Sequence, residues 1–284
     1  MMIADAQVHI WAADTPERPW PPRNAHRAHR PVPFGEADLI REMDGAGVSR
    51  AIIVPPSWEG DRNDLALAAA SHHPDRLRVM GRPPLSAPDP HALDQWRDQP
   101  GMLGIRVTTA GAGARALFTD PEGDWLWAAA ERHNIPAMLS PPGVLPEVYR
   151  IAERHPGMRF VIDHLALSRD GKDEAAFADL DNLLALAKLP NVAAKASALP
   201  RYSTEPYPYR RLHPFLHHVY DAFGPHRLFW GTDLTGIPCT YREAITLFTE
   251  ELPWLEGEEL ELVMGKALCV WLGWRQPLAE AAPS

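Results

Sequence analysis

The sequence predicts an α/β protein built as one (β/α)8 barrel, the TIM-barrel form, over residues 1–274. Short runs of Val, Ile, Leu and Ala alternate eight times with amphipathic segments, which is typical of a parallel sheet made of βα units. A length of 284 residues suits one closed barrel. Hydrophobic residues make up 45% of the chain and charged residues 23%, so the composition favours a large core.

The predicted elements follow one another in strict alternation. Strands are expected at residues 3–10, 51–54, 78–81, 102–107, 135–140, 158–163, 191–197 and 227–232. Helices are expected at 36–47, 61–73, 89–98, 120–133, 144–155, 173–188, 209–223 and 240–252, with a last helix at 257–271. Residues 275–284 are expected to form a C-terminal tail.

Two predicted connections are longer than the others, at about 11–35 and 198–210, and both contain several prolines and aromatic residues. Long loops in compact domains are commonly functional. Because they follow the first and seventh strands, we expect both to lie over the C-terminal end of the barrel, where barrel enzymes carry their active sites.

The net charge of −9 argues against a nucleic-acid partner, because such a chain offers no broad basic surface. No apolar run approaches the roughly 20 residues that cross a bilayer, so no membrane partner is expected. The two cysteines are too few for a disulfide framework. We expect a cytoplasmic protein that acts on a small molecule, and a homo-oligomer is compatible with the sequence.

Polar side chains stand at the ends of the predicted strands. In the first strand Asp5, Gln7 and His9 alternate with apolar residues and are expected to face into the barrel. The residues that close the other strands are Arg82, Arg106, Ser140, His164, Ser197 and Asp233. Strand ends of a barrel converge on one concavity, so these groups predict an active site.

Structural roles compete with this interpretation. A single inward histidine is often only a buried core residue. Asp163-His164 and Asp233 are placed to cap the helices that follow them. Arg106, or Lys195 on the seventh strand, is placed to form a buried ion pair with Asp5. The coincidence of polar groups at so many strand ends nevertheless favours function for His9, His164 and Asp233 together.

Five motifs, in this order and spacing, resemble the amidohydrolase 2 branch of the amidohydrolase superfamily, which includes 2-pyrone-4,6-dicarboxylate lactonase and sugar lactonases. The opening Asp5-Ala6-Gln7-Val8-His9-Ile10-Trp11 resembles D-A-H-x-H-x-W of that branch. The others are Gly104-Ile105-Arg106, Asp163-His164, the strand from Asn191 to Ser197, and Trp230-Gly231-Thr232-Asp233. The resemblance implies an amidohydrolase-like barrel with hydrolase activity.

One position departs from the family pattern and bears on cofactors. Gln7 stands where the first histidine of the H-x-H pair is expected, and an amide is a poor replacement for imidazole toward zinc. We therefore favour no cofactor. If a divalent metal such as Zn or Mn is bound, its expected ligands are His9, His164 and Asp233.

The resemblance implies a lactonase mechanism. Asp233 is expected to act as general base toward water, while His9 and His164 polarise the substrate carbonyl. Gln7, Ser140 and Lys195 are expected in the substrate site. Arg82 and Arg106, with Arg27, Arg201 and Tyr202 from the long loops, are expected to bind a small anionic substrate such as a lactone carboxylate.

Two other functions fit the same residues. One is a metal-dependent decarboxylase or amidohydrolase of the same superfamily, for which bound stoichiometric metal would be diagnostic. The other is a degenerate barrel that binds a ligand without turnover, since Gln7 is compatible with lost chemistry.

Overall fold

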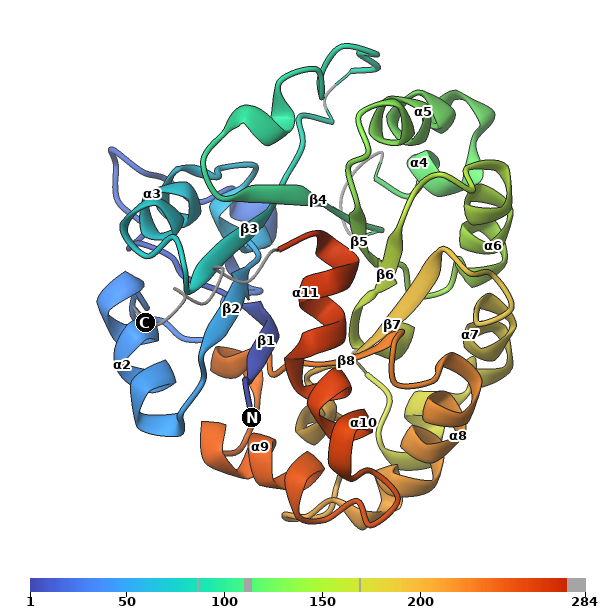
Figure 1. The fold of residues 1–284 in the computed structure, drawn as a ribbon. Coiled ribbons are helices and arrows are strands. Elements are labelled where there is room, and N and C mark those ends of the chain that lie inside the picture. Colours follow the sequence, from blue (N-terminus) through green and yellow to red (C-terminus); the bar gives the residue numbers. More distant parts are fainter. Residues whose placement is uncertain (86, 110–113, 169, 275–284) are drawn as a thin grey trace, which may run out of the picture.

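The computed structural model describes residues 1–85, 87–109, 114–168 and 170–274, and in them the predicted TIM barrel is confirmed. Eight parallel strands follow one another in chain order around the barrel (Figure 1). They are β1 (Ala4–Val8), β2 (Arg50–Ile53), β3 (Leu77–Gly81), β4 (Met102–Thr108), β5 (Ala137–Ser140), β6 (Phe160–Ile162), β7 (Val192–Ala196) and β8 (Leu228–Trp230).

Helices surround the strands, most of them where the sequence predicts them (Figure 1). The longer ones are α2 (Glu36–Ala46), α3 (Asp64–His72), α5 (Asp124–Arg132), α6 (Leu145–Arg154), α7 (Leu180–Leu186), α8 (His213–Phe223) and α9 (Tyr241–Thr249). Short helices α1 (Pro22–Ala25) and α4 (Ala116–Thr119) lie in connections, and α10 (Gly257–Glu261) and α11 (Ala267–Leu272) come last. The predicted tail 275–284 lies outside the described residues.

The prediction of a helix at 89–98 is wrong. This segment forms turns and a single 3-10 turn at Trp96–Asp98. Pro88 and Pro90 restrict the backbone at its start, and the Asp89 carboxylate accepts a hydrogen bond from the His91 backbone N–H at 2.9 Å. Such local bonds compete with a helix.

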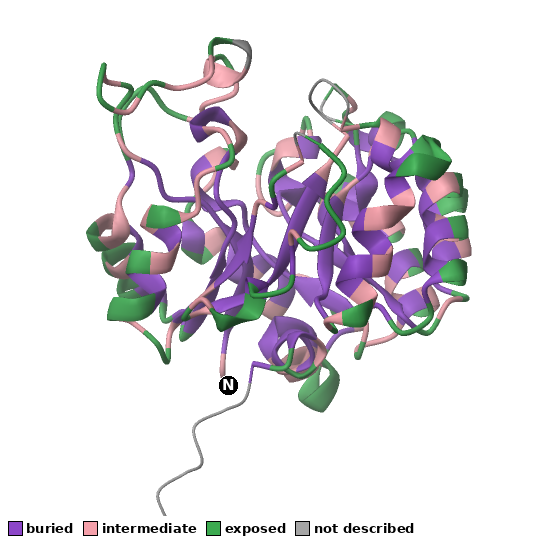
Figure 2. Ribbon diagram, turned by 90° about the horizontal axis from the view of Figure 1, so that it is seen from above, coloured by how far each residue is buried: buried purple, intermediate pink, exposed green. Residues whose placement is uncertain are grey.

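The hydrophobic core has two layers. Outward-facing strand residues pack on the helices in the larger cluster, while Ile52, Met80, Met138, Phe229 and their neighbours fill the barrel interior. Figure 2 shows the strands buried, with exposed residues on the outer faces of the helices. Helix α11 lies across the barrel in Figure 1 and contributes Leu268 and Leu272 to the interior cluster. The barrel is therefore closed at the end opposite the strand carboxyl ends.

The placement of Asp5 differs from the prediction. The register between β1 and β2 shifts between Asp5 and Val8, so a bulge changes which side chains face inward. Ala4 and Ala6 belong to the interior cluster, and Asp5 pairs in register with Ala51, whose side chain packs on the outer layer. Asp5 therefore faces the surrounding helices, while Gln7 and His9 reach the mouth of the barrel.

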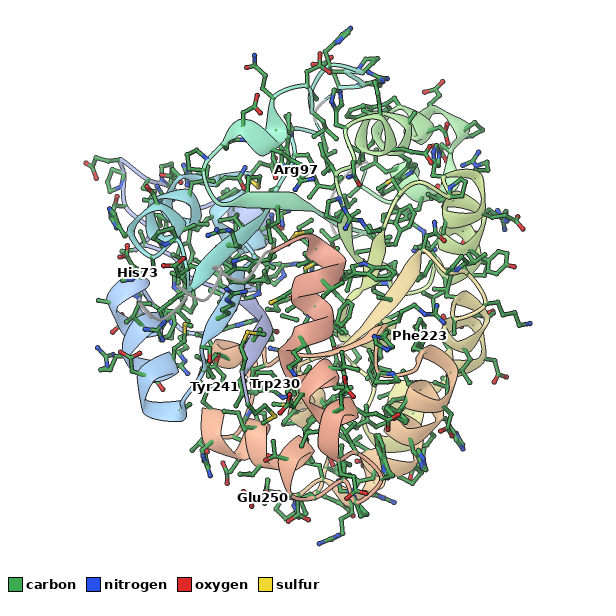
Figure 3. The ribbon with its side chains drawn as sticks, viewed as in Figure 1. His73, Arg97, Phe223, Trp230, Tyr241 and Glu250 are labelled. Carbon is green, nitrogen blue, oxygen red and sulfur yellow. The ribbon has the colours of Figure 1, made fainter. Side chains whose placement is uncertain are left out.

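Asp5 joins the first strand to the end of the last one. Its Oδ1 accepts the backbone N–H groups of Gln7 and Thr232, both at 2.9 Å. Its Oδ2 accepts the hydroxyls of Thr232 at 2.5 Å and Tyr241 at 2.8 Å. Tyr241 also stacks on Trp230, with ring centroids 6.4 Å apart (both labelled in Figure 3). One buried carboxylate thus holds β1, the end of β8 and α9 together.

None of the helices in the described part of the chain combines the length and the apolar character that crossing a lipid bilayer would require.

Replacing Asp5 by Ala is expected to lower the free energy of unfolding by about 3 kcal/mol or more, because several buried donors lose their acceptor and each costs about 1–3 kcal/mol. Asp5→Asn is the matched control. Its amide oxygen still accepts the two backbone N–H groups, and its NH2 donates to the rotatable hydroxyls of Thr232 and Tyr241. Urea unfolding of the three proteins measures the difference, and an Asp5→Ala variant within about 1 kcal/mol of the wild type would contradict the closure role.

Candidate active site

A cavity of about 90 Å³ lies at the carboxyl ends of the strands. The cavity is lined by Gln7 and by six of the strand-end residues that the sequence singles out. They are His9, Arg82, Arg106, Ser140, His164 and Asp233. The long first loop adds Arg27 and His29, and the loop after β7 adds Arg201. The structure therefore brings the predicted groups together at the end of the barrel where they are expected.

Sharp turns of the backbone aim several of these side chains. His164, Ala198 and Asp233, which follow β6, β7 and β8, all have positive φ, at 51°, 58° and 59°. This left-handed region is unfavourable for residues other than glycine, and such strain concentrates at functional sites. The strands thus end abruptly, and His164 and Asp233 turn into the cavity.

Asp163 lies beneath the cavity, fully buried between two cations. Its carboxylate is 2.5 Å from Nε of Arg106 and 2.7 Å from Nζ of Lys195. Burial opposes ionisation of Asp163, but the charges of Arg106 and Lys195 outweigh it and hold the pKa of this carboxyl below its ordinary value. The alternative in which Arg106 or Lys195 pairs with Asp5 is wrong, because the β1 bulge turns Asp5 to the outer face.

Lys195 fixes the orientation of the Gln7 amide. Its Nζ donates to Oε1 of Gln7 at 2.5 Å. Because an ammonium has no acceptor, the amide oxygen must face it, and the NH2 group must face the cavity. Nε2 of Gln7 lies 3.2 Å from Nε2 of His164 and 3.4 Å from Nε2 of His9. Gln7 therefore presents a donor to the site.

The two imidazoles beside Gln7 are held through their other nitrogens. Nδ1 of His9 donates to the backbone carbonyl of Val54 at 2.5 Å, and Nδ1 of His164 is 2.8 Å from Oγ of Ser197. Burial lowers the pKa of His164 to about 3, so its ring is neutral near pH 7. Both rings consequently present Nε2 to the cavity.

Asp233 is the one carboxylate in the cavity wall, and positively charged or chargeable groups face it. Oδ1 is 3.0 Å from Nε2 of His9, and Oδ2 is 3.3 Å from an Nη of Arg201 and 3.9 Å from Nε2 of His29. Burial alone raises the pKa of a carboxyl, but His29, His9 and Arg201 together hold that of Asp233 well below its usual range. Asp233 is ionised at neutral pH.

The opposite wall carries excess positive charge. Arg82 and Arg106 both line the cavity, and the Nε of Arg82 lies 3.4 Å from the carboxylate of the exposed Asp61. Burial lowers the pKa of Arg82, and the charge of Arg106 lowers it further. An anion bound between these guanidinium groups would relieve their repulsion.

Some predicted residues lie elsewhere. Tyr202 is buried in the core and does not line the cavity, so we no longer assign it a contact with substrate. Lys195 is fully buried beneath Gln7 and acts through it. The ligand-type side chains that lie close together are His9, Asp233 and His29, so His29 stands in place of the predicted His164.

Sequence reasoning missed two important side chains. From the sequence, His29 has no assigned role, and Asp163 is a candidate helix cap. No local pattern identifies His29, because the folding of the loop alone brings it to Asp233. For Asp163 a signal existed, since a buried strand that ends in a carboxylate requires a cation.

Two sequence comparisons find proteins similar to this chain. The family model described as amidohydrolase matches residues 4–267. An L-fucono-1,5-lactonase from Burkholderia ambifaria is 31% identical over 238 residues, which cover 81% of this chain and 79% of that protein.

Solved structures show the same fold at lower identity. One is a probable 2-pyrone-4,6-dicarboxylic acid hydrolase from Acinetobacter baumannii with citric acid bound, at 20% identity and a TM-score of 0.77, covering 96% of this chain and all of that one. Another is an amidohydrolase from Burkholderia multivorans with bound Zn, at 22% identity and a TM-score of 0.77, covering 96% and 99% of the two chains.

Asp163→Asn is expected to lower the free energy of unfolding by about 3–5 kcal/mol, because it leaves the buried charges of Arg106 and Lys195 without an anion. The matched control is Asp61→Asn, which removes an exposed carboxylate and should cost less than about 1 kcal/mol. Chemical denaturation measures both values. Equal, small losses in the two variants would show that Asp163 does not carry this charge balance.

Proposed function

The chain belongs to the amidohydrolase family and is a hydrolase, and from that premise we propose that it opens the ring of a small anionic lactone by attack of water. The lactonase relative supports the reaction. The observation that carries the proposal is the cavity itself, in which an ionised Asp233 lies beside His9 and shares with Gln7 and His164 a space with room only for a small molecule.

In the proposed mechanism Asp233 orients a water molecule and accepts its proton as the oxygen attacks the lactone carbonyl. The bond between the carbonyl carbon and the ring oxygen then breaks. The proton held by Asp233 passes to that oxygen, which leaves as a hydroxyl. Water is consumed, and the opened chain carries a hydroxyl and a carboxylic acid, which releases one proton to solvent at neutral pH and becomes the carboxylate.

The negative charge that develops on the carbonyl oxygen needs donors. The Gln7 amide NH2 points between His9 and His164, where an entering carbonyl oxygen would accept from it. The Ser197 hydroxyl can donate to Nδ1 of His164, which permits the tautomer with hydrogen on Nε2. His9 has an acceptor at each nitrogen, the Val54 carbonyl at Nδ1 and Asp233 at Nε2, and in its charged form it completes this group as a donor from Nε2.

A metal ion does not fit this donor set as it stands. His9, His29 and Asp233 each offer one ligand atom, and these atoms lie within 4.8 Å of one another. However, the Gln7 amide turns its NH2 group, not its oxygen, to the cavity. The guanidinium of Arg201 also lies against two of the three ligand atoms, at 3.3 and 3.4 Å. We therefore derive the mechanism from side chains alone and propose no cofactor.

The charge of the cavity supports an anionic substrate. Arg27, Arg82, Arg106 and Arg201 line it, against the single carboxylate of Asp233. A carboxylate on the lactone would bind between Arg82 and Arg106, beside Ser140. Arg27, from the first loop, adds positive charge at the entrance.

Asp233→Asn is expected to lower kcat about 10²- to 10⁴-fold, because an amide cannot accept the proton of water. Substrate binding should persist, so KM or the inhibition constant of a ring-opened product should change little. Hydrolysis of a lactone panel that includes L-fucono-1,5-lactone and 2-pyrone-4,6-dicarboxylate, followed at constant pH, measures both. Near-normal turnover by this variant would remove Asp233 from the mechanism.

Arg82→Gln is expected to raise KM for 2-pyrone-4,6-dicarboxylate or another carboxylated lactone roughly 10- to 100-fold, since a hydrogen bond to a charged group is lost. A neutral sugar lactone is the matched control and should be hydrolysed with nearly unchanged KM. Arg82 is preferred to Arg106 because Arg106 also neutralises Asp163. If both substrate types respond equally, charge recognition at this wall is wrong, although lactone hydrolysis would stand.

A further inference from the structure

His9, His29 and Asp233 form a cluster with the geometry of a three-ligand metal site. Nδ1 of His9 is held by the carbonyl of Val54, and Nδ1 of His29 is 2.9 Å from Oγ1 of Thr235. Each ring therefore directs Nε2 toward Asp233. Metal-binding histidines are commonly oriented in this way by an oxygen at the other nitrogen.

A guanidinium group already lies in this cluster. One Nη of Arg201 is 3.3 Å from Oδ2 of Asp233 and 3.4 Å from Nε2 of His29. The same Nη donates to the Gly236 carbonyl, and it places a positive charge against two of the three atoms that a metal ion would need. Since guanidinium groups stay protonated, this charge is permanent at physiological pH.

Arg201 is held in this place by the loop after β8. Its Nε and an Nη donate to the carbonyl of Gly236 at 3.0 and 2.8 Å. A Cβ at position 236 would lie 1.8 Å from an Nη of Arg201 and 2.7 Å from Cε1 of His29. The close approach of both side chains thus requires glycine at position 236, so the guanidinium is part of a built site.

We propose that the Arg201 guanidinium is the resident cation of the His9, His29 and Asp233 cluster and excludes divalent metal ions from it. A metal ion would have to break the contacts of Arg201 with Asp233 and His29 and then lie close to a second positive charge. Removal of the guanidinium should leave the imidazoles of His9 and His29 and the carboxylate of Asp233 available as ligands. Together they suit zinc or cobalt, with water as a fourth ligand.

The test is titration of purified protein with Co²⁺, followed by the visible spectrum and by isothermal calorimetry, and Zn²⁺ analysis after gel filtration. Wild-type protein should retain far less than one ion per chain. Arg201→Met should bind about one ion per chain, with a Kd at least roughly tenfold lower than that of the wild type. Adding His29→Ala or Asp233→Asn to Arg201→Met should abolish this gain.

Arg82→Met is the matched control, because it removes a cavity guanidinium that the cluster does not contact. It should gain no site, so an equal gain in Arg82→Met would attribute the effect to general charge and overturn the proposal. Stoichiometric metal in the wild type, or no gain in a folded Arg201→Met protein, would also overturn it. Arg201→Lys, which keeps a charge but cannot reach both Gly236 and Asp233, provides a second variant and should gain partial binding.

These measurements need no substrate. The metal proposal and the lactonase proposal can therefore fail separately: a panel without turnover leaves the cobalt titration intact, and a metal-binding wild type leaves lactone hydrolysis intact.

Discussion

The arrangement of the site depends on the buried carboxylate of Asp163. Two cations contact it, and each does something that the cavity needs: Arg106 forms part of the wall, and Lys195 holds the oxygen of Gln7. Neither cation would be stable in the barrel interior without an anion. Asp163 thus holds Lys195 in place, and Lys195 in turn orients the Gln7 amide. The Gln7 amide then directs its NH2 group toward the imidazoles of His9 and His164.

Local charge in the cavity is opposite to the charge of the molecule. The chain as a whole carries −9, yet four arginines and a single carboxylate line the cavity. Solvent and salt screen charges at the surface, whereas groups within the barrel mouth interact at short range and with less screening. Net charge therefore gives little information about the substrate.

The sequence predicted the barrel well because its signals are periodic and local. Alternation of apolar runs located all eight strands, and six of the seven predicted strand-end residues line the cavity, while Ser197 contacts His164. The failures come from interactions that no local pattern contains. The bulge in β1 turned Asp5 to the outer face, two prolines and Asp89 replaced the helix at 89–98 with turns, and a long loop brought His29 to Asp233.

The same limits apply to function. The type and order of strand-end residues were sufficient to indicate a hydrolase, because the chemistry requires a base, donors and a place for them to meet. They were insufficient to decide between an ion and a side chain as the source of positive charge. The proposal that a side chain supplies this charge rests on Arg201 and Gly236. Most of the chain separates them from His29, so only the folded structure shows that they contact it.

A guanidinium and a metal ion would affect Asp233 differently. Either cation keeps the carboxylate ionised, but each also makes it a weaker base, and a dication coordinated directly to the oxygen does so more strongly. At 3.3 Å, Arg201 contacts Oδ2 as a singly charged ion-pair partner and leaves Oδ1 beside His9. In the proposed mechanism Asp233 must accept a proton from water, and it stays more basic beside the guanidinium than it would when bound to a divalent metal ion. The presence of Arg201 and the amide at Gln7 are then two parts of one arrangement, in which side chains supply both the donors and the positive charge for the reaction.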